Sequence, residues 1–550
     1  MKGAQALIRT LVDAGVRTCF SNPGTSEMHF VAALDAVPEM RAVLALFEGV
    51  ATGAADGYAR IADAPAATLL HLGPGLGNGL ANLHNARRAH SPIVNIVGDH
   101  ATYHARYDAP LQSDIETVAR NVSGWVRSSR SVGEVGRDAA AAVAAASGPP
   151  GQVATLILPA DVSWDEGAQP APPPAPPDPA PASDETVQTI ARALGAGRRA
   201  ALLLGGRALR ERPLLAAARI AAATGARLLA ETFPARLERG AGLPAVERLA
   251  YVPEFASVQL EGLAHLVLVD AQAPVSFFAY PGRRSYLVPD GCQVHELVAA
   301  TGDVPASLEA LLDALAAGGA RPPLQPAGRP APPSGPLTAE RACQAIGAVL
   351  PEGAIVSDEA VTSGLSLPAA TAGAPRHDWL TLTGGAIGQG LPAAVGAAVA
   401  APERPVLALQ AEGSAMYTIQ ALWTMAREQL NVTVVIFNNR SYGILNMELA
   451  RVGADGGGER ARAQLDLSAP DLDFVRLAGG LGVGAERVQT GEQLMRALER
   501  ALAEPGPHLI EVPVPNVYSP RQLKAMPFAL RMIERLPRPL ASALTRRLAS

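Results

Sequence analysis

The sequence contains almost no lysine: Lys2 and Lys524, near its two ends, are the only two among 550 residues. A Walker-type phosphate-binding loop needs a lysine in its Gly-Lys-Ser/Thr motif, and a pyridoxal phosphate enzyme needs a lysine for its Schiff base. The scarcity of lysine therefore excludes both classes of enzyme.

Cysteine is also scarce, since only Cys19, Cys292 and Cys343 occur and they are far apart. An odd number of scattered cysteines argues against a disulfide framework and favours a reducing compartment. No cluster of cysteine and histidine has the spacing of a zinc site. No apolar run approaches the ~18 residues of a membrane span, and the N-terminal residues lack the basic-then-apolar pattern of a signal peptide. We therefore expect a cytoplasmic protein.

The remaining composition is that of a large globular protein. Its length corresponds to roughly three or four domains, and a hydrophobic content of 48% with a mean hydropathy of +0.14 is sufficient for buried cores. The net charge of −5 gives no indication of a nucleic-acid partner.

Two proline-rich segments divide the chain, at residues 168–183 and 319–336. Proline-rich runs favour extended, semi-rigid linkers over packed structure. The predicted organisation is therefore a first domain at 1–167, a central domain at 184–318, a third domain at 337–516 and a tail at 517–550.

Each block alternates short apolar segments with helical patterns. Apolar segments that run into glycine, proline or polar residues predict buried parallel strands. They occupy 18–20, 43–47, 67–71 and 93–97 in the first block, 200–204 and 266–269 in the second, and 355–357, 406–410 and 432–437 in the third. Helices are predicted at 4–14 and 49–61. The alternation predicts an α/β fold with three doubly wound parallel-sheet domains.

A carboxylate and a pair of amides follow two consecutive predicted strands near the C-terminal end. Glu412 and Asn439 are separated by about the length of a parallel βαβ unit, roughly 30 residues. The carboxyl ends of parallel strands open on the same edge of a sheet. Because Mg²⁺ prefers oxygen ligands, Glu412, Asn439 and a backbone carbonyl near Ser441 are predicted to hold this ion. The alternative is an ordinary strand–turn–helix in which Ser414 caps the helix.

Polar residues also follow three strands of the first block. Glu48 precedes a helix rich in glycine and alanine, His71 precedes a glycine-rich segment, and Thr25 closes an Asn-Pro-Gly-Thr sequence. Each has a structural interpretation: Glu48 caps a helix, His71 supports the strand end, and Thr25 belongs to a turn. The glycines after His71 predict a sharp turn with close backbone approach.

Taken together, these motifs resemble those of the thiamin diphosphate (ThDP) enzymes. That family carries Gly-Asp-Gly followed, one βαβ unit later, by Asn-Asn, where this chain has Ala411-Glu412-Gly413 and Asn438-Asn439. The resemblance covers residues 1–516. It implies pyrimidine-binding, central and diphosphate-binding domains, with ThDP and Mg²⁺ as cofactors. The glutamate is a departure from the family, and its longer side chain must fit Mg–O distances of roughly 2.0–2.1 Å.

The resemblance also implies a role for each site residue. Glu48 would hydrogen-bond the aminopyrimidine ring and promote the tautomer that removes the thiazolium proton. The carbonyl of Gly385 would accept from the pyrimidine amino group, and Ile387 would hold the cofactor in its bent conformation. The diphosphate would be lined by Gly413, Ser414, Tyr442, Gly443 and Ile444.

His71 and Thr25 resemble the active-site histidine and serine of the benzoylformate decarboxylases. This implies proton transfer or substrate-carboxylate contact for His71 and a hydrogen bond to that carboxylate for Thr25. We therefore expect decarboxylation of a small 2-oxo acid through an enamine intermediate. Those enzymes carry a second histidine in the central domain, whereas this chain has Pro274–Tyr280 there. Its Phe277 and Phe278 suggest an apolar pocket instead.

Two other interpretations stay open. The same organisation fits an acetolactate synthase-type carboligase acting on pyruvate. With Ala411 and Glu412 in place of the family residues, the chain also fits a degenerate, non-catalytic relative acting as a binding or regulatory subunit. The central block shows no flavin signature, so FAD is not expected. Because ThDP lies between two subunits in this family, the resemblance implies a homodimer or homotetramer.

The tail is basic: residues 519–550 contain seven lysine and arginine residues against a single acid, Glu534. Its apolar residues are interrupted by Pro527, Pro537 and Pro539. We expect the tail to dock back on the protein or on a neighbouring subunit. Contact of a basic amphipathic segment with a membrane surface is the less favoured alternative.

Overall fold

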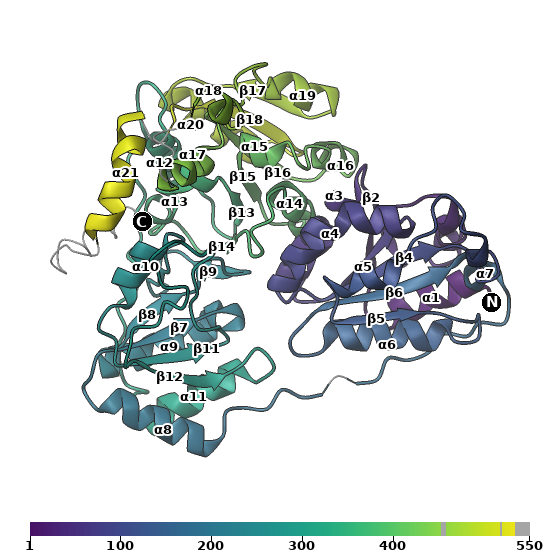
Figure 1. Ribbon diagram of the computed structural model, residues 1–550, viewed down its shortest axis with the longest axis horizontal. Helices are drawn as coiled ribbons and strands as arrows, with labels where there is room; N and C mark the ends of the chain where they lie inside the picture. Colours follow the sequence, from purple (N-terminus) through teal and green to yellow (C-terminus); the bar gives the residue numbers. More distant parts are fainter. Residues whose placement is uncertain (176, 453–457, 517–519, 534–550) are drawn as a thin grey trace.

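The computed structural model describes residues 1–175, 177–452, 458–516 and 520–533. It contains three α/β domains, each built on its own sheet. In Figure 1 the first domain lies on the right, the central domain at the lower left and the third domain above it. Over the described residues, no helix combines the length and the apolar character needed to cross a membrane.

The first domain is built on a six-stranded parallel sheet with the order β2-β1-β3-β4-β6-β5. Its strands are β1 (Thr18–Asn22), β2 (Arg41–Leu44), β3 (Ala66–Leu70), β4 (Ile93–Asp99), β5 (Trp125–Ser128) and β6 (Val153–Pro159). Its helices are α1 (Gly3–Asp13), α2 (Met28–Ala33), α3 (Glu48–Ala62), α4 (Leu72–Arg88), α5 (Ile115–Arg120), α6 (Val135–Ser147) and α7 (Ala160–Trp164). The strands β3 and β6 are buried along their whole length, as expected for parallel strands covered on both faces.

The central domain has a five-stranded parallel sheet with the order β10-β8-β7-β11-β12. Its strands are β7 (Ala200–Leu204), β8 (Arg227–Ala230), β10 (Glu247–Arg248), β11 (His265–Val269) and β12 (Gln293–Val298). Its helices are α8 (Asp184–Gly195), α9 (Glu211–Thr224), α10 (Pro253–Leu260) and α11 (Val304–Ala314).

The third domain has a seven-stranded sheet with the order β17-β18-β16-β15-β13-β14-β9. Its strands are β13 (Ile355–Glu359), β14 (His377–Leu380), β15 (Val406–Ala411), β16 (Val432–Asn438), β17 (Gly484–Arg487) and β18 (His508–Pro513). The edge strand β9 (Leu237–Arg239) comes from the central part of the chain and pairs antiparallel with β14. The sequence pattern gave no indication of this exchange, which fastens the central domain to the third.

The helices of the third domain surround this sheet. They are α12 (Ala339–Val349), α13 (Leu367–Ala370), α14 (Gly390–Ala400), α15 (Glu412–Ala415), α16 (Ala421–Arg427), α17 (Gly443–Arg451), α18 (Glu459–Ala463), α19 (Phe474–Gly480), α20 (Gly491–Ala503) and α21 (Pro520–Ile533).

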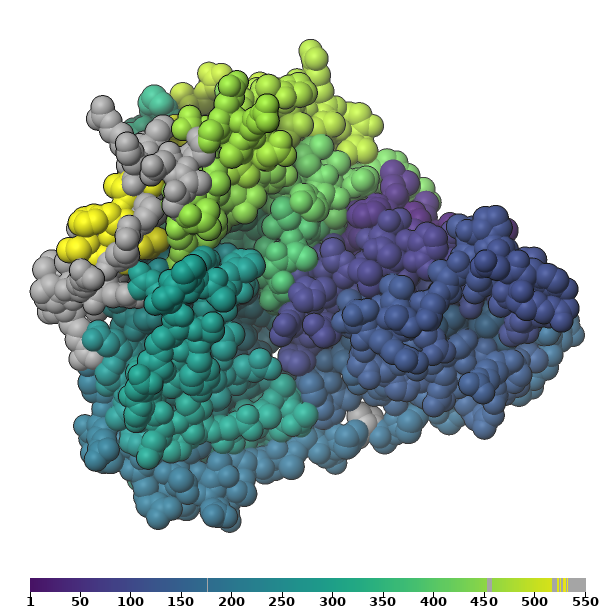
Figure 2. Space-filling model, in the orientation of Figure 1, coloured from purple at the N-terminus to yellow at the C-terminus, as the bar shows by residue number. Residues whose placement is uncertain are grey.

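The first and third domains lie against each other in Figure 2, and α3 packs on α14 between them. Small residues let these helices approach closely: a Cβ atom on Gly57 would collide with the backbone of Ala393, and one on Gly396 would collide with the carbonyl oxygen of Ala54. This helix contact therefore requires glycine at positions 57 and 396, because a larger residue at either position would force one of the helices to move.

A buried ion pair lies at this helix contact. Asp56 is fully buried and accepts from Arg60 Nε and Nη2 at 2.8 and 2.6 Å, from Ser91 Oγ at 2.5 Å and from Gln389 Nε2 at 2.7 Å. The guanidinium of Arg60 also donates to the carbonyl of Thr381 at 2.9 Å. One carboxylate thus joins α3 to the segment before α14.

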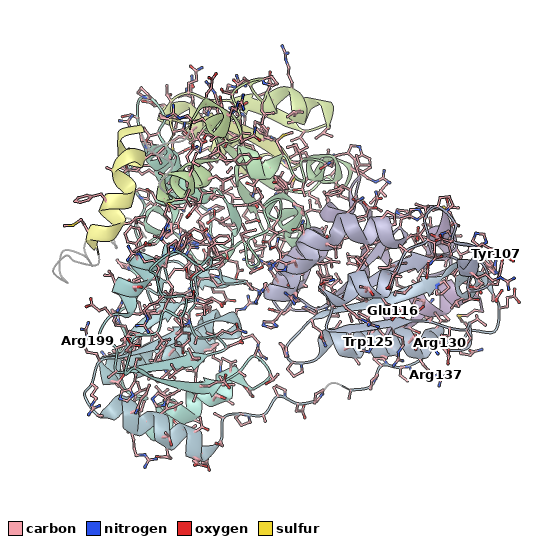
Figure 3. The ribbon with its side chains drawn as sticks, in the orientation of Figure 1. Tyr107, Glu116, Trp125, Arg130, Arg137 and Arg199 are labelled. Carbon is pink, nitrogen blue, oxygen red and sulfur yellow. The ribbon has the colours of Figure 1, made fainter. Side chains whose placement is uncertain are left out.

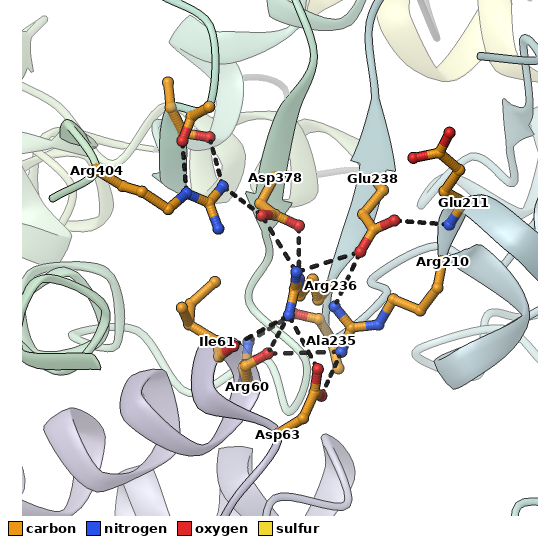
Figure 4. Close-up of polar contacts among 12 residues, drawn as sticks. Arg60, Ile61, Asp63, Arg210, Glu211, Ala235, Arg236, Glu238, Asp378 and Arg404 are labelled. Carbon is orange, nitrogen blue, oxygen red and sulfur yellow. Dashed lines mark hydrogen bonds and ion pairs between the residues drawn. The ribbon is translucent and has the colours of Figure 1, made fainter. Parts of the chain in front are cut away.

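Arg236 joins all three domains (Figure 4). Its side chain donates to Asp378 in β14 at 2.5 Å and to the carbonyl oxygens of Arg60 and Ile61 in α3 at 3.1 and 3.2 Å. It also pairs with Glu238 in β9 at 3.2 Å. A buried guanidinium with five donors is suited to such a junction.

The two proline-rich segments differ from the domains on either side. The described residues of the first segment, 168–175 and 177–183, contain no helix or strand. They run along the lower edge of the molecule in Figure 1. The described helix α21 packs against α17 and α10, as the prediction of a docked tail implies. Helix α21 continues through Pro527, which interrupts the apolar residues of the tail in the sequence. Residues 534–550, including Pro537 and Pro539, lie outside the described residues.

We expect Arg236→Met to lower the free energy of unfolding by about 3 kcal/mol, because it removes one of the two cations that pair with buried Asp378 and the donor to the carbonyl oxygens of Arg60 and Ile61. Chemical denaturation followed by circular dichroism measures the change. Arg212→Met is the matched control, since Arg212 forms an exposed ion pair with Glu309 and should cost under about 1 kcal/mol. Equal losses in the two variants would contradict the role given to Arg236.

This loss should depend on pH. Burial alone would raise the pKa of Asp378, but the guanidinium groups of Arg236 and Arg404 lower it and the net shift is downward. A carboxylate with a lowered folded-state pKa adds stability above its unfolded pKa of about 3.9, and this contribution is lost as pH falls through the folded value. The difference between wild type and Arg236→Met should therefore be full near neutral pH and shrink in acid.

Candidate active site

Glu48 is the first residue of α3. The predicted strand 43–47 was too long, because β2 ends at Leu44 and Phe47 caps the helix. The Glu48 side chain is only 7% exposed, and Oε2 accepts a hydrogen bond from Asn78 Nδ2 at 3.0 Å. A Cβ atom on Gly75 would lie 2.9 Å from Glu48 Oε1 and 3.4 Å from the Cβ of His71. Glu48 and His71 are therefore neighbours across a glycine.

His71 follows β3 and forms a pair with a buried glutamate. Its Nδ1 lies 2.7 Å from Oε2 of Glu27, which is 3% exposed. Because an ionised carboxylate only accepts, Nδ1 carries the proton and Nε2 is left as the second functional nitrogen. The glycines after His71 do not form the predicted turn, since they belong to the first turns of α4.

The Asn-Pro-Gly-Thr loop holds this pair in place. Gly24 N donates to Glu27 Oε2 at 2.8 Å, and a Cβ atom on Gly24 would collide with the His71 ring. Ser26 Oγ donates to Glu27 Oε1 at 2.8 Å and lies 3.3 Å from His71 Nδ1. Thr25 is exposed. The hydroxyl beside the imidazole is thus that of Ser26, whereas the role predicted for Thr25 stays a prediction.

Glu359, at the end of β13, fixes the glycine-rich turn at 384–390 through its carboxylate. Its carboxylate accepts from Gly388 N and Gly390 N, both at 2.7 Å. Burial raises the pKa of Glu359 to about 7, although these amide donors oppose the shift. Gly385 has a φ of 76°, and its carbonyl accepts no hydrogen bond from the described residues. This carbonyl is thus free to accept a hydrogen bond, so its predicted contact with the pyrimidine amino group stays a prediction, and Ile387 is half-buried two residues further on.

Two asparagines of helix α4 also form hydrogen bonds with this turn. Asn85 Nδ2 donates to the carbonyl of Ala386 at 2.8 Å and its Oδ1 accepts from Ala386 N at 3.2 Å. Asn82 Nδ2 donates to the carbonyl oxygens of Gly49 and Gly388 at 2.7 and 3.2 Å. The turn and the start of α3 are therefore fixed relative to each other.

Glu412 and Asn439 lie at the ends of β15 and β16, as predicted. Glu412 is 1% exposed and its Oε1 accepts from Ser441 N at 2.8 Å. Burial raises its pKa, and the amides of residues 439–441 oppose this shift. Glu412 Oε2 and Asn439 Oδ1 are both buried without a hydrogen-bond partner. Two orphaned oxygens are a costly arrangement unless a cation binds them, so the residues present fit Mg²⁺ in spite of the longer side chain.

The predicted diphosphate-binding groups are only partly available. The amide of Tyr442 donates to the carbonyl of Leu465 at 3.0 Å, and the amide of Gly443 donates to that of Ser441 at 2.9 Å. Ser414 Oγ donates to the carbonyl of Ala411 at 3.0 Å. Gly413 has no room for a side chain, because a Cβ atom there would be 2.5 Å from the Tyr442 ring.

The amide of Ile444, in the first turn of α17, has no acceptor among the described residues. It is therefore the open donor at this helix end, where the helix dipole favours an anion.

An aromatic cluster from the central domain lies over the glycine-rich turn. The ring of Phe277 meets Phe233 edge-on, with centroids 5.3 Å apart, and lies 5.1 Å from the ring of Tyr251. Its Cε1 would be 3.9 Å from a Cβ atom on Gly385. Phe277 is 42% exposed and Phe278 59% exposed. The stretch that replaces the family's second histidine thus presents an apolar wall.

Sequence reasoning missed Glu27, Asn78 and Glu359. Glu359 lies two residues after the predicted strand 355–357 and is the last residue of β13, so the argument used for Glu48 and Glu412 would have found it. Glu27 and Asn78 had no such signal, because they meet His71 and Glu48 only after the chain folds.

These geometries agree with the comparisons. The N-terminal and C-terminal TPP binding domains of the thiamine pyrophosphate enzymes match residues 1–119 and 365–512. The chain belongs to this family. It is 62% identical to the Mycobacterium tuberculosis protein named "Putative acetolactate synthase large subunit IlvX", over 94% of this chain and 100% of that protein. It is 31% identical to benzoylformate decarboxylase of Pseudomonas aeruginosa, over 92% of this chain and 97% of that enzyme.

The fold has the same relatives. The ThDP-dependent 4-hydroxybenzoylformate decarboxylase of Rhodococcus jostii RHA1 superposes with a TM-score of 0.83 at 26% identity, covering 94% of this chain and 100% of that one. The prediction of three α/β parallel-sheet domains of the ThDP-enzyme type is therefore confirmed.

We expect Glu412→Gln to weaken Mg²⁺-dependent ThDP binding at least about tenfold, because it removes the charge of the one carboxylate in the oxygen site. Quenching of protein fluorescence by ThDP, titrated at several Mg²⁺ concentrations, measures this. Glu340→Gln, an exposed position on α12, is the control. Unchanged Mg²⁺ dependence in Glu412→Gln would remove Glu412 from the metal site.

We expect Glu27→Gln to reduce turnover about 10- to 100-fold while ThDP affinity stays the same, because the amide no longer fixes the His71 tautomer. Proton NMR of the imidazole N–H, together with steady-state kinetics, tests both effects. The control Glu116→Gln changes an exposed carboxylate of α5 (Figure 3). Normal turnover in Glu27→Gln would show that His71 does not need this partner.

Proposed function

We propose that the protein is a ThDP- and Mg²⁺-dependent decarboxylase of a 2-oxo acid, acting without an external oxidant. The observation that carries this proposal is the His71–Glu27 pair beside Glu48. Non-oxidative decarboxylation must end with delivery of a proton to the carbon that lost CO₂. A neighbouring imidazole held in one tautomer by a buried carboxylate is suited to this step.

The residues divide the work between cofactor and substrate. ThDP, when bound, supplies the electron sink for loss of CO₂. Glu48 holds a proton at the pyrimidine end, while Glu412 and Asn439 hold Mg²⁺ at the diphosphate end. Ile387 and the glycine-rich turn fix the orientation of the cofactor. His71 then moves the proton to and from the substrate.

The aromatic cluster supports a substrate with a bulky apolar or aromatic body. Phe277 is partly exposed, and its ring is held by contacts with the rings of Phe233 and Tyr251. Such a preordered ring binds an aromatic group at low entropic cost. This favours an aryl 2-oxo acid such as benzoylformate over pyruvate.

We infer that the active unit is at least a homodimer, with a homotetramer as the larger alternative. Large apolar side chains are exposed next to both halves of the site: Met28 and Leu46 near Glu27 and Glu48, Tyr417 after Glu412. Exposed apolar surface beside a functional site is typical of a protein interface.

A second candidate is acetolactate formation from pyruvate. The name of the 62% identical relative favours it. In that reaction the carbon that lost CO₂ attacks the carbonyl of a second pyruvate, so the apolar wall would have to admit one small acceptor beside the donor. A non-catalytic role is a third alternative. The presence of Glu48, His71 and Asn439 argues against it.

The test is CO₂ release from benzoylformate and from pyruvate, with ThDP and Mg²⁺ supplied or withheld and products identified. We expect cofactor-dependent benzaldehyde formation. Acetolactate from pyruvate would instead establish the carboligase. Failure to bind ThDP at all would refute the catalytic reading.

Glu48→Gln should retain its fold and most of its cofactor affinity, yet lose at least about 100-fold in turnover, since an amide cannot exchange the proton. Circular dichroism, ThDP titration and CO₂ release separate these effects. Full activity in this variant would remove Glu48 from the mechanism.

A further inference from the structure

A cavity of about 260 Å³ lies between the central and third domains, away from the residues of the candidate active site. One wall is formed by β9, β10 and the segment between them, and the other by α13 and Trp379 of β14. In Figure 1 this is the place where β9 joins the edge of the third sheet. Domain interfaces are preferred positions for small-molecule sites.

Two arginines point their charge at this cavity. The guanidinium of Arg239 lies 5.1 Å above the ring of Trp379 and donates to the carbonyl of Pro368 at 2.5 Å. Arg248 lines the same cavity, and its guanidinium has no hydrogen bond or ion pair with any described residue. Burial lowers the pKa of Arg239 to about 10 and also lowers that of Arg248, so both stay protonated at neutral pH. Arg248 is half-buried, so its five donors, which have no acceptor among the described residues, are open to water or to a ligand in the cavity.

The acids nearby do not neutralise this charge. Asp358 is the one carboxylate that attracts both guanidinium groups, and it already accepts from Trp379 Nε1 at 3.0 Å and from Ala360 N at 3.1 Å. Glu238 and Glu247 line the cavity too, but their carboxylates pair elsewhere.

Glu238 is engaged by Arg236 and Arg210, and Glu247 by Arg227 and Gln259. Two guanidinium groups against one carboxylate leave a single positive charge beside a mostly apolar lining. Such a charge favours the binding of an anion in the cavity.

The remainder of the lining selects among anions. It is mostly apolar, with Leu237, Pro244, Val246, Pro368, Ala369 and Trp379 among its members. A phosphate dianion would exceed the charge available and would have to lose its hydration against apolar walls. A carboxylate on a small apolar body satisfies both the guanidinium fork and the walls.

We propose that this cavity binds a small aliphatic monocarboxylate, with its carboxylate on Arg248 and Arg239 and its apolar body against Trp379 and Val246. The site is separate from the one that would decarboxylate a 2-oxo acid. Its occupant would nevertheless lie close to the active site along the chain, because Asp358 adjoins Glu359, which holds the glycine-rich turn.

The test uses isothermal titration of the full-length protein, without ThDP, against 3-methylbutanoate, its neutral amide and inorganic phosphate. We expect saturable binding of the carboxylate, with the amide and phosphate at least about tenfold weaker. Arg248→Met should weaken the carboxylate at least about tenfold. Arg199→Met, an exposed arginine on the outer surface of the central domain (Figure 3), should leave it unchanged.

A second pair of variants avoids any dependence on the folding of Arg248→Met. Ala245 is exposed and lines the cavity, so Ala245→Glu should place a competing carboxylate there and abolish binding, whereas Ala245→Gln should retain it. No saturable binding, or equal binding in Ala245→Glu and Ala245→Gln, would overturn the proposal, and phosphate binding that is as tight would overturn the ligand class. Because none of these measurements requires turnover, failure here is distinct from failure of the proposed decarboxylase activity.

Discussion

The arrangement of the molecule depends on the buried ion pair between Asp56 and Arg60. The two side chains lie where α3 and α14 approach through glycine, and they form hydrogen bonds with Ser91, Gln389 and the carbonyl of Thr381, which follows β14. A buried pair of this kind is tolerable only while every lone pair and donor has a partner. The packing of the first domain on the third and the position of the glycine-rich turn therefore depend on the same ion pair. Arg236 connects the central domain to this pair through the carbonyl of Arg60.

Three carboxylates show how similar positions acquire different uses. Glu359, Glu412 and Glu48 all lie where the chain leaves a strand for a turn or helix. Both oxygens of Glu359 are occupied by backbone amides, so it is a structural brace. Glu412 has one oxygen occupied and one orphaned, and Glu48 is held through Oε2 alone. The number of unoccupied oxygens, more than the position in the chain, separates bracing from ligand binding.

The order of strands and helices was predictable because parallel strands covered on both faces are apolar along their length. The placement of Glu412 and Asn439 was predictable for a related reason, since the ends of β15 and β16 bring them to one edge of the sheet. The sequence did not show the strand exchange by β9, which has no local signal, nor the Glu27–His71 contact, which joins residues 44 positions apart. Glycine was misread after His71: without tertiary contacts a glycine-rich segment predicts a turn, whereas packing on α3 makes it helical.

Helix α21 rests on α17, whose Ile444 amide has no acceptor among the described residues and which we propose binds the diphosphate. Docking of α21 on α17 and binding of the diphosphate at α17 are then thermodynamically linked, and the linkage is reciprocal. If docking of α21 stabilises the position of α17 that binds the diphosphate, then binding of the diphosphate stabilises the docked α21 by the same free energy. Removal of this helix would therefore be felt as a loss of cofactor affinity, and a chain loaded with cofactor would hold its C-terminal helix more firmly against proteolysis than an empty one.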